Sequence, residues 1–287
     1  MKSLFCTDGS AISYNSLLNF AKFVNKDAVI DTICVIDWSF LPDDIVIEES
    51  GFAGQCQNVA DTILERTKDV IISAGMQNGN LIKRCGSVVE TILEQVESNN
   101  YEFIILGTHG KKGFERWLGS VSKEIFSACN NSIFISKEKA DSKKILFATD
   151  GTDFAYNIIN DALMKLDLCD AEIYICSVVE NPELLFLDGT LDSNWFMAIQ
   201  TQQEIYSEKA ILRVKKLIEN YNLDIAETKV ITDTPAHGII EYAHEKKIDL
   251  IVLGTKNKSK MRSFLLDSVS KKVVEHVNCA TLVIKKS

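Results

Sequence analysis

The chain has 287 residues, of which 46% are hydrophobic and 25% are charged, and its formal net charge at pH 7 is −9. This length allows two ordinary domains, and the composition is that of a globular protein, which excludes a disordered chain or a low-complexity filament. The acidic balance argues against a general nucleic-acid binder, which needs a basic face. No apolar run approaches the roughly 20 residues that span a bilayer, so no membrane partner is expected.

The N-terminus and the cysteines indicate a cytoplasmic protein. Met1 and Lys2 lead directly into a strand-like run, without the basic region and apolar stretch of a secretory signal. The eight cysteines are scattered, include no Cys-x-x-Cys pair and lie in several cases within apolar runs. In such surroundings a free thiol behaves as a small hydrophobic side chain, so a structural role is favoured over a metal or redox role.

Apolar, β-rich runs alternate with amphipathic segments along the chain. The expected strands are residues 3–7, 29–36, 81–85, 103–107 and 132–136 in the first half, and 144–149, 172–179, 227–232, 249–254 and 280–285 in the second. Long helices are expected near 54–77 and 195–221. This alternation is typical of parallel βαβ units covered by helices on both faces, and it predicts an α/β fold.

Two further helix starts carry recognisable signals. Ser87-Val-Val-Glu90 has the spacing of a capping box, in which the serine and glutamate side chains bind the first free amides. Thr234 precedes Pro235, which places a capping residue before a proline at the first helical position. Both segments are predicted to open helices.

The two halves of the chain repeat the same order of signals. Thr7-Asp8-Gly9-Ser10 follows the first expected strand, and Thr149-Asp150-Gly151-Thr152 follows its counterpart. The offset between corresponding residues grows along the chain, so the second half carries a few extra residues. We interpret the chain as a duplication, with domain 1 at residues 1–138 and domain 2 at residues 143–287, joined by a short polar link.

The two halves differ most around the loop after the fourth strand. The first half reads Gly107-Thr108-His109-Gly110 and then Gly119-Ser120-Val121-Ser122, where a helix is expected to start. The second half reads Gly254-Thr255-Lys256-Asn257 and then Asp267-Ser268-Val269-Ser270. Glycine can adopt positive φ and lets the backbone approach an anion, and a helix N-terminus favours negative charge. The first loop is therefore predicted to bind phosphate.

The place of this loop in the expected sheet supports a ligand site. In an open parallel sheet, ligands bind outside the carboxyl ends of the strands, where the winding direction reverses. With strand order 3-2-1-4-5, that crevice lies between the first and fourth strands, which end at Asp8 and Gly107. The glycine spacing is neither that of a P-loop nor Gly-x-Gly-x-x-Gly, and by itself it suits an ordinary turn equally well. Its repetition in the same context strengthens the ligand interpretation.

At these positions the chain resembles a tandem universal stress protein, with each half similar to one family domain. The resemblance rests on residues 7–10, Val35-Ile36-Asp37, residues 107–110 and residues 119–122. It implies two repeated, doubly wound, Rossmann-like parallel five-stranded sheets of order 3-2-1-4-5. It also implies a stress-response regulatory protein that binds ATP, with or without Mg²⁺.

The nucleotide-binding branch of that family carries the pattern Gly-x2-Gly-x9-Gly-Ser/Thr, and the resemblance implies contacts residue by residue. Asp8 and the Val35 backbone would contact adenine. His109 is not among the residues that the resemblance assigns; its place inside the glycine loop allows it either to face the phosphates or to shape the loop. The ribose and phosphates would be held by Gly107, Gly110, Gly119, Ser120 and Val121.

Both halves depart from the family pattern. Eight residues, 111 to 118, separate Gly110 from Gly119, where the pattern has nine. The second half keeps nine, but Asn257 and Asp267 replace two of the glycines. An aspartate before a helix can cap the amides that a phosphate would use, and its charge repels a triphosphate. Domain 2 is therefore predicted to bind ATP weakly or not at all.

Three classes of function remain open from the sequence. The leading hypothesis is a regulatory protein in which domain 1 binds ATP without efficient turnover and domain 2 has a structural role. The alternatives are a slow ATPase or phosphotransferase that uses Lys111 and a divalent ion, and a nucleotide-free scaffold. No metal-binding histidine motif or Gly-x-Ser-x-Gly elbow occurs, so no catalytic or metal-ligating residue is assigned. The resemblance also implies that residues 131–136 and 280–285 pair the domains internally as a pseudo-dimer, and a homodimer of two chains is an open alternative.

Overall fold

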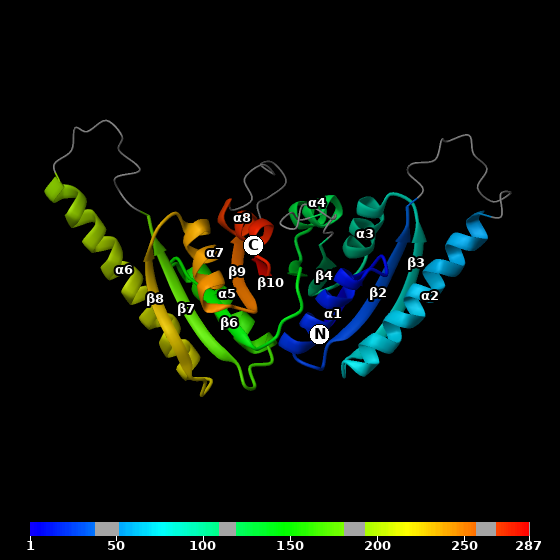
Figure 1. The fold of residues 1–287 in the computed structure, drawn as a ribbon, viewed down its shortest axis with the longest axis horizontal. Helices are drawn as coiled ribbons and strands as arrows, with labels where there is room; N and C mark the ends of the chain where they lie inside the picture. The colour runs from blue at the N-terminus through cyan, green and yellow to red at the C-terminus, as the bar shows by residue number, and fades with distance from the viewer. Residues whose placement is uncertain (38–51, 109–118, 181–192, 257–267, 287) are drawn as a thin grey trace. The chain divides into compact units, whose positions relative to one another are not determined.

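The chain forms two compact units, Met1–Lys139 and Ala140–Ser287, each of which is an α/β fold (Figure 1). The structure is a computed structural model, and it describes residues 1–37, 52–108, 119–180, 193–256 and 268–286. No helix in these ranges combines the length and apolar character that a membrane span requires.

The first unit alternates strands and helices throughout. Its elements are β1 (Lys2–Cys6), α1 (Ala11–Phe23), β2 (Val29–Ile36), α2 (Phe52–Ser73), β3 (Gln77–Cys85), α3 (Val88–Glu97), β4 (Phe103–Gly107), α4 (Ser120–Ala128) and β5 (Ser132–Ser136). The strands lie in the order β3-β2-β1-β4-β5, and every pairing between them is parallel. The predicted order 3-2-1-4-5 is confirmed for this unit.

The second unit repeats this topology. Its elements are β6 (Lys144–Ala148), α5 (Asp153–Lys165), β7 (Glu172–Val179), α6 (Ser193–Glu219), β8 (Ile225–Thr232), α7 (Pro235–Lys246), β9 (Leu250–Lys256), α8 (Ser268–His276) and β10 (Ala280–Lys286). The order is β8-β7-β6-β9-β10, again with parallel pairing throughout. The predicted duplication of the fold is confirmed.

Buried aromatic side chains hold the helix α1 against the sheet of the first unit. Phe20 on α1 lies edge-on to Phe103 of β4 and Phe134 of β5, with ring centroids 5.8 Å and 5.4 Å away. All three side chains are fully buried. Such pairs add to the hydrophobic stabilisation that comes from removing the rings from water. This packing holds the end of α1 against the start of β4, and Ser16 Oγ, which donates to the Leu106 carbonyl over 2.7 Å, holds its first half beside the carboxyl end of that strand.

The turn after the first strand is built in the same way in both units. Gly9 has φ +78°, and its amide donates to Thr7 Oγ1 over 3.0 Å. The Ser10 amide donates to Asp8 Oδ1, and Ser10 Oγ caps α1 by accepting from the Ser13 amide. In the second unit, residues 149–155 make the matching contacts, and its glycine also has φ +78°. The repeated Thr-Asp-Gly-Ser/Thr signal therefore encodes a strand-to-helix turn.

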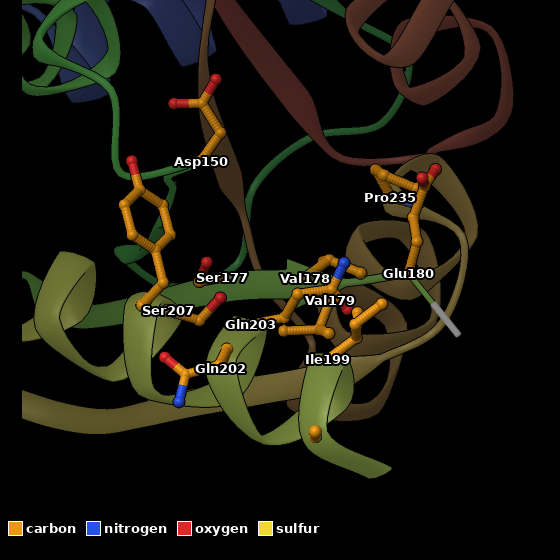
Figure 2. A pocket seen from close by; sticks show the side chains of 12 residues that line it. Asp150, Ser177, Val178, Val179, Glu180, Ile199, Gln202, Gln203, Ser207 and Pro235 are labelled. Atoms are coloured by element: carbon orange, nitrogen blue, oxygen red, sulfur yellow. The ribbon is translucent and has the colours of Figure 1, made fainter. Parts of the chain in front are cut away.

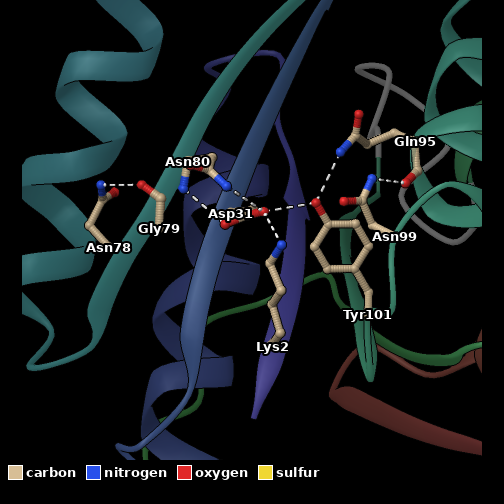
Figure 3. Close-up of polar contacts among 8 residues, drawn as sticks. All are labelled: Lys2, Asp31, Asn78, Gly79, Asn80, Gln95, Asn99 and Tyr101. Carbon is tan, nitrogen blue, oxygen red and sulfur yellow. Dashed lines mark hydrogen bonds and ion pairs between the residues drawn. The ribbon is translucent and has the colours of Figure 1, made fainter.

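A buried carboxylate joins strands at the amino-terminal edge of the first sheet. Asp31 of β2 is 1% exposed, and its side chain accepts hydrogen bonds from the Asn80 amide at 2.8 Å and from the Tyr101 hydroxyl at 2.8 Å (Figure 3). Lys2 Nζ lies 3.0 Å from Asp31 Oδ2. Burial raises the pKa of Asp31, but hydrogen bonds from Asn80, Lys2 and Tyr101 outweigh it and hold the pKa below its ordinary value.

This carboxylate also explains an irregularity in β3. The β2–β3 register shifts between Ile30 and Thr32, so β3 carries one extra residue opposite Asp31. A Cβ atom at Gly79 would overlap Asp31 Oδ1, so the position requires glycine. The bulge lies in the polar part of β3, which starts at Gln77 and not at residue 81 as predicted. The alternation of apolar residues that marks a strand is absent there.

The two helix starts are confirmed in position, but the capping-box contacts are not formed. Helix α3 starts after Ser87, which makes no side-chain hydrogen bond to the first turn. Thr234 precedes Pro235 at the start of α7 and likewise makes no such bond. The prediction that Ser87 caps α3 with its side chain was therefore wrong, because the spacing of a motif does not fix the rotamer of its serine.

Candidate functional site

Three of the predicted site residues lie at the carboxyl edge of the first sheet. Cys6 of β1 is in register with Ile33 of β2 on one side and with Leu106 of β4 on the other. Asp8 follows β1, Val35 is the penultimate residue of β2 and Gly107 ends β4, so all three lie at the point where the strand order reverses. Asp8 is exposed, and Val35 and Gly107 are half-buried. The structure thus brings these residues to the edge where open parallel sheets bind ligands.

The start of α4 supplies the second part of the site. Gly119 is the N-cap of this nine-residue helix and provides no side-chain hydrogen bond to the first turn. Ser120 is exposed and Val121 is half-buried. Ser122 Oγ donates to the Gly107 carbonyl over 2.6 Å, which fastens the first turn of α4 to the end of β4. The helix N-terminus is thereby held beside the strand ends, with its positive dipole end lacking a side-chain cap.

The positive φ that was predicted for the glycines of this loop is absent at two of them. Gly119 has φ −59°, and Gly107 is not among the glycines with positive φ. A Cβ atom at Gly107 would lie 2.8 Å from the Ser13 Cα atom and 3.0 Å from the Ser13 nitrogen. Gly107 is therefore required by the close approach of helix α1 to β4. At Gly119 the missing side chain instead leaves the helix start uncapped.

We expect Gly107→Ala to destabilise the first unit by about 1–3 kcal/mol, because the new methyl group meets backbone atoms of α1. The matched change in the second unit, Gly254→Ala, meets side-chain atoms of Ile158 and Phe154, which can shift. Gly254→Ala should therefore destabilise its unit by less than Gly107→Ala does. Urea unfolding of the two variants measures the difference, and equal costs would contradict the packing explanation for Gly107.

The Asp8 carboxylate has a structural task in addition to any ligand contact. Its Oδ1 atom accepts the Ser10 amide over 3.0 Å, and Asp150 Oδ1 accepts the Thr152 amide over the same distance. Because both units use the aspartate in this way, the motif alone does not distinguish a nucleotide-binding unit from one that lacks the nucleotide. The contact between Asp8 and adenine stays a prediction.

Several predicted residues lie outside the described part of the chain. His109 and Gly110 fall there, as do residues 111–118, so the effect of the shortened loop stays a prediction. Asn257 and Asp267 of the second half also lie outside it. In the second unit, Ser270 Oγ donates to the Gly254 carbonyl over 2.9 Å, as Ser122 does to Gly107. This hydrogen bond between the last helix and the fourth strand is common to both units.

The buried thiols near this edge are held in their neutral form. Burial, and to a smaller extent the Asp8 charge, raises the pKa of Cys34 to about 11. Burial also raises the pKa of Cys6, and the nearby Cys129 adds to it. A thiol needs a lowered pKa to act as a nucleophile near neutral pH. Within the described ranges, no group of three or more His, Cys, Asp or Glu side chains is placed to hold a metal ion.

Comparison with known proteins places the chain in one family. The sequence model of the universal stress protein family matches residues 1–137 and again residues 142–285. Universal stress protein MJ0531 of Methanocaldococcus jannaschii is 33% identical over 144 residues, which cover 50% of this chain and 82% of that protein. Universal stress protein YxiE of Bacillus subtilis is 29% identical over 148 residues, which cover 50% of this chain and 98% of that protein.

A solved structure extends the similarity to the whole chain. The crystal structure of a universal stress protein from Archaeoglobus fulgidus DSM 4304 covers 100% of this chain and 98% of its own, with a TM-score of 0.71 and 22% sequence identity. At this identity the structure supports the fold alone, while the two matches of the family model support membership. The chain therefore belongs to the universal stress protein family and carries two family domains in tandem.

Proposed function

We propose that the chain is a regulatory nucleotide-binding protein whose first domain binds ATP. The observation that carries this proposal is the start of α4, where the N-cap residue Gly119 has no side chain to cap the helix and Ser122 Oγ donates to the carbonyl at the end of β4. A helix N-terminus with free amides is a favourable place for phosphate oxygens. Asp8 and Val35, at the neighbouring strand ends, would then contact the adenine, as the resemblance to the nucleotide-binding branch implies.

The proposal assigns the nucleotide to one domain only. Asp267 precedes α8 in the sequence at the place where Gly119 precedes α4. A carboxylate there competes for the helix amides and repels phosphate, whereas glycine does neither. The second domain is therefore proposed to bind ATP far more weakly, and ATP occupancy of the first domain is proposed to be the regulatory signal.

Binding without efficient turnover fits the side chains at this edge. The Asp8 carboxylate accepts a hydrogen bond within the turn, and the Cys34 thiol is neutral near pH 7. A neutral thiol is a weak nucleophile, so Cys34 is not prepared for covalent catalysis. Pairing of the domains through residues 131–136 and 280–285 stays a prediction, as does a larger dimer. A cytoplasmic location and a role for Mg²⁺ also stay predictions.

Calorimetric titration of ATP into the full chain tests the proposal. We expect saturable binding with one site per chain. We also expect product analysis of the same samples to show that little ADP forms during the titration. Absence of saturable binding at millimolar ATP would contradict the proposal and favour a nucleotide-free scaffold. Steady ADP formation would instead favour the slow ATPase.

A further inference from the structure

The solvent face of α6 in the second unit carries three large apolar side chains. Met197, Ile205 and Leu212 are 68%, 38% and 49% exposed, and we call them the α6 stripe. Successive members are eight and seven residues apart, which is about two turns of an α-helix, so they lie along one side of α6. Gln203 and Ser207 lie on the opposite side and line a cavity beside β7 (Figure 2). The α6 stripe therefore faces solvent.

The corresponding helix of the first unit is α2, and shared contacts align the two helices. Arg66 of α2 lies over the Tyr14 ring, 4.9 Å from its centroid, and Arg213 of α6 lies over the Tyr156 ring, 4.1 Å from its centroid. Arg66 therefore corresponds to Arg213. The residues with positive φ that follow the two helices keep the same offset, and they are Gly75 and Asn222.

Two members of the α6 stripe correspond to polar residues of α2. At this offset Asn58 corresponds to Ile205, and Glu65 corresponds to Leu212. Asn58 and Glu65 are exposed, so the fold itself does not require apolar side chains at these positions. Single exposed apolar residues are ordinary, but several that lie together mark an interaction surface. The α6 stripe is therefore interpreted as a surface that a partner covers.

The order of charges along α6 indicates which partner covers the stripe. Acidic residues come first and basic residues follow before the helix ends at Glu219: Glu204 and Glu208 precede Lys209, Arg213, Lys215 and Lys216. A second α6 helix in antiparallel orientation places this acidic part beside a basic part, whereas a parallel helix would place like charges together. The helix is thus complementary to an antiparallel copy of itself.

The positions of the apolar residues fit the same arrangement. In an antiparallel pair, Ile205 of each chain can lie against Leu212 of the second copy. Glu204 then lies beside Lys215 of the second copy, and on the same side of the pair, because eleven residues make about three helical turns. A two-fold axis repeats each contact, so the pair has two apolar contacts and two ion pairs.

We propose that two copies of the chain associate through antiparallel pairing of their α6 helices, with Ile205 and Leu212 at the centre of the contact. This surface is distinct from residues 131–136 and 280–285, through which the domains are predicted to pair. A contact of a few side chains is small beside the roughly 1,200–2,000 Å² that stable complexes bury, so the dimer is weak and forms as the concentration rises. The proposal does not depend on ATP binding to the first domain.

Sedimentation velocity of the full chain over a range of concentrations tests the proposal. Wild type is expected to shift from monomer to dimer as the chain concentration rises to submillimolar values. Ile205→Asp and Leu212→Asp each place a charge within the contact and should weaken dimerisation by about tenfold or more. Val59→Asp is the matched control, because Val59 is an apolar residue of α2 that is 60% exposed. That variant should dimerise as wild type does.

An exchange of charges tests the antiparallel register. Glu204→Lys and Lys215→Glu should each weaken dimerisation by about threefold or more, because each places like charges together at two points of the contact. The double variant E204K/K215E restores opposite charges at both points and should dimerise as wild type does. Both side chains lie at the surface, so the thermal midpoints of these variants should stay close to that of wild type.

The outcomes separate this proposal from the proposed function. Gly119→Asp changes only the first domain and should dimerise as wild type does, whatever its affinity for ATP. The proposal is overturned if wild type stays monomeric at every concentration, or if Ile205→Asp dimerises as wild type does. It is also overturned if Val59→Asp weakens dimerisation as much as Ile205→Asp, or if E204K/K215E dimerises no better than the single charge variants.

Discussion

Replacing Gly119 with aspartate is expected to reduce the affinity of the chain for ATP by about 100-fold or more. The aspartate would accept hydrogen bonds from the first-turn amides of α4 and place a negative charge against the phosphates. Loss of two charge-assisted hydrogen bonds, each worth roughly 1.5–3 kcal/mol, is enough for that change. Gly119 has φ −59° and ψ 154°, which any residue can adopt, so the substitution adds no backbone strain. Calorimetric titration of ATP measures the effect.

Gly119→Ala is the matched control for this prediction. Alanine neither caps the helix nor carries charge, so ATP affinity should fall by less than about tenfold. The aspartate variant should be at least as stable to heat as the alanine variant, because aspartate is the better N-cap. If the aspartate variant binds ATP as tightly as wild type, the α4 N-terminus is not the phosphate site.

Asp31→Ala is expected to lower the free energy of unfolding by about 2–4 kcal/mol. The change leaves the buried Tyr101 hydroxyl and the Asn80 amide without their acceptor, and it removes the partner of Lys2. Asp61→Ala is the control, because Asp61 also pairs with a lysine, Lys83 at 2.7 Å, but its side chain is 55% exposed. That variant should lose less than about 1 kcal/mol. Urea unfolding of both variants gives the comparison.

The stabilisation from Asp31 should also depend on pH in a defined direction. Its pKa is lowered in the folded chain, so its contribution is fully present above the unfolded value, about 3.9. The contribution is lost as the pH falls from that value through the folded pKa. Wild type should therefore lose more stability on acidification than Asp31→Ala does. Equal acid dependence in the two proteins would show that folding does not lower the pKa of Asp31, contrary to this account.

The sheet was predictable from the sequence because buried parallel strands are continuous apolar runs. Residues 29–36, 103–107 and 132–136 were predicted with the bounds that the structure gives. The polar start of β3 at Gln77 was missed, since its bulge serves the Asp31 carboxylate and carries no apolar pattern. Long-range polar networks of this kind join residues that are distant in sequence and leave little signal in any one segment.

The candidate site was predictable in position but less so in mechanism. Gly107 and Gly119 were correctly placed at a strand end and a helix start, yet the reason for glycine differs at each. Gly107 makes room for Ser13 of α1, a contact that sequence spacing cannot show.

The central claim is that the nucleotide belongs to the first domain, and photolabelling of the full chain with 8-azido-ATP tests it most directly. Proteolysis and mass spectrometry then locate the label on either side of the boundary between Lys139 and Ala140. The account predicts labelled peptides from residues 1–139, with labelling suppressed by unmodified ATP and lost in Gly119→Asp. Label that lies mainly in residues 140–287, and that ATP also suppresses, would contradict it.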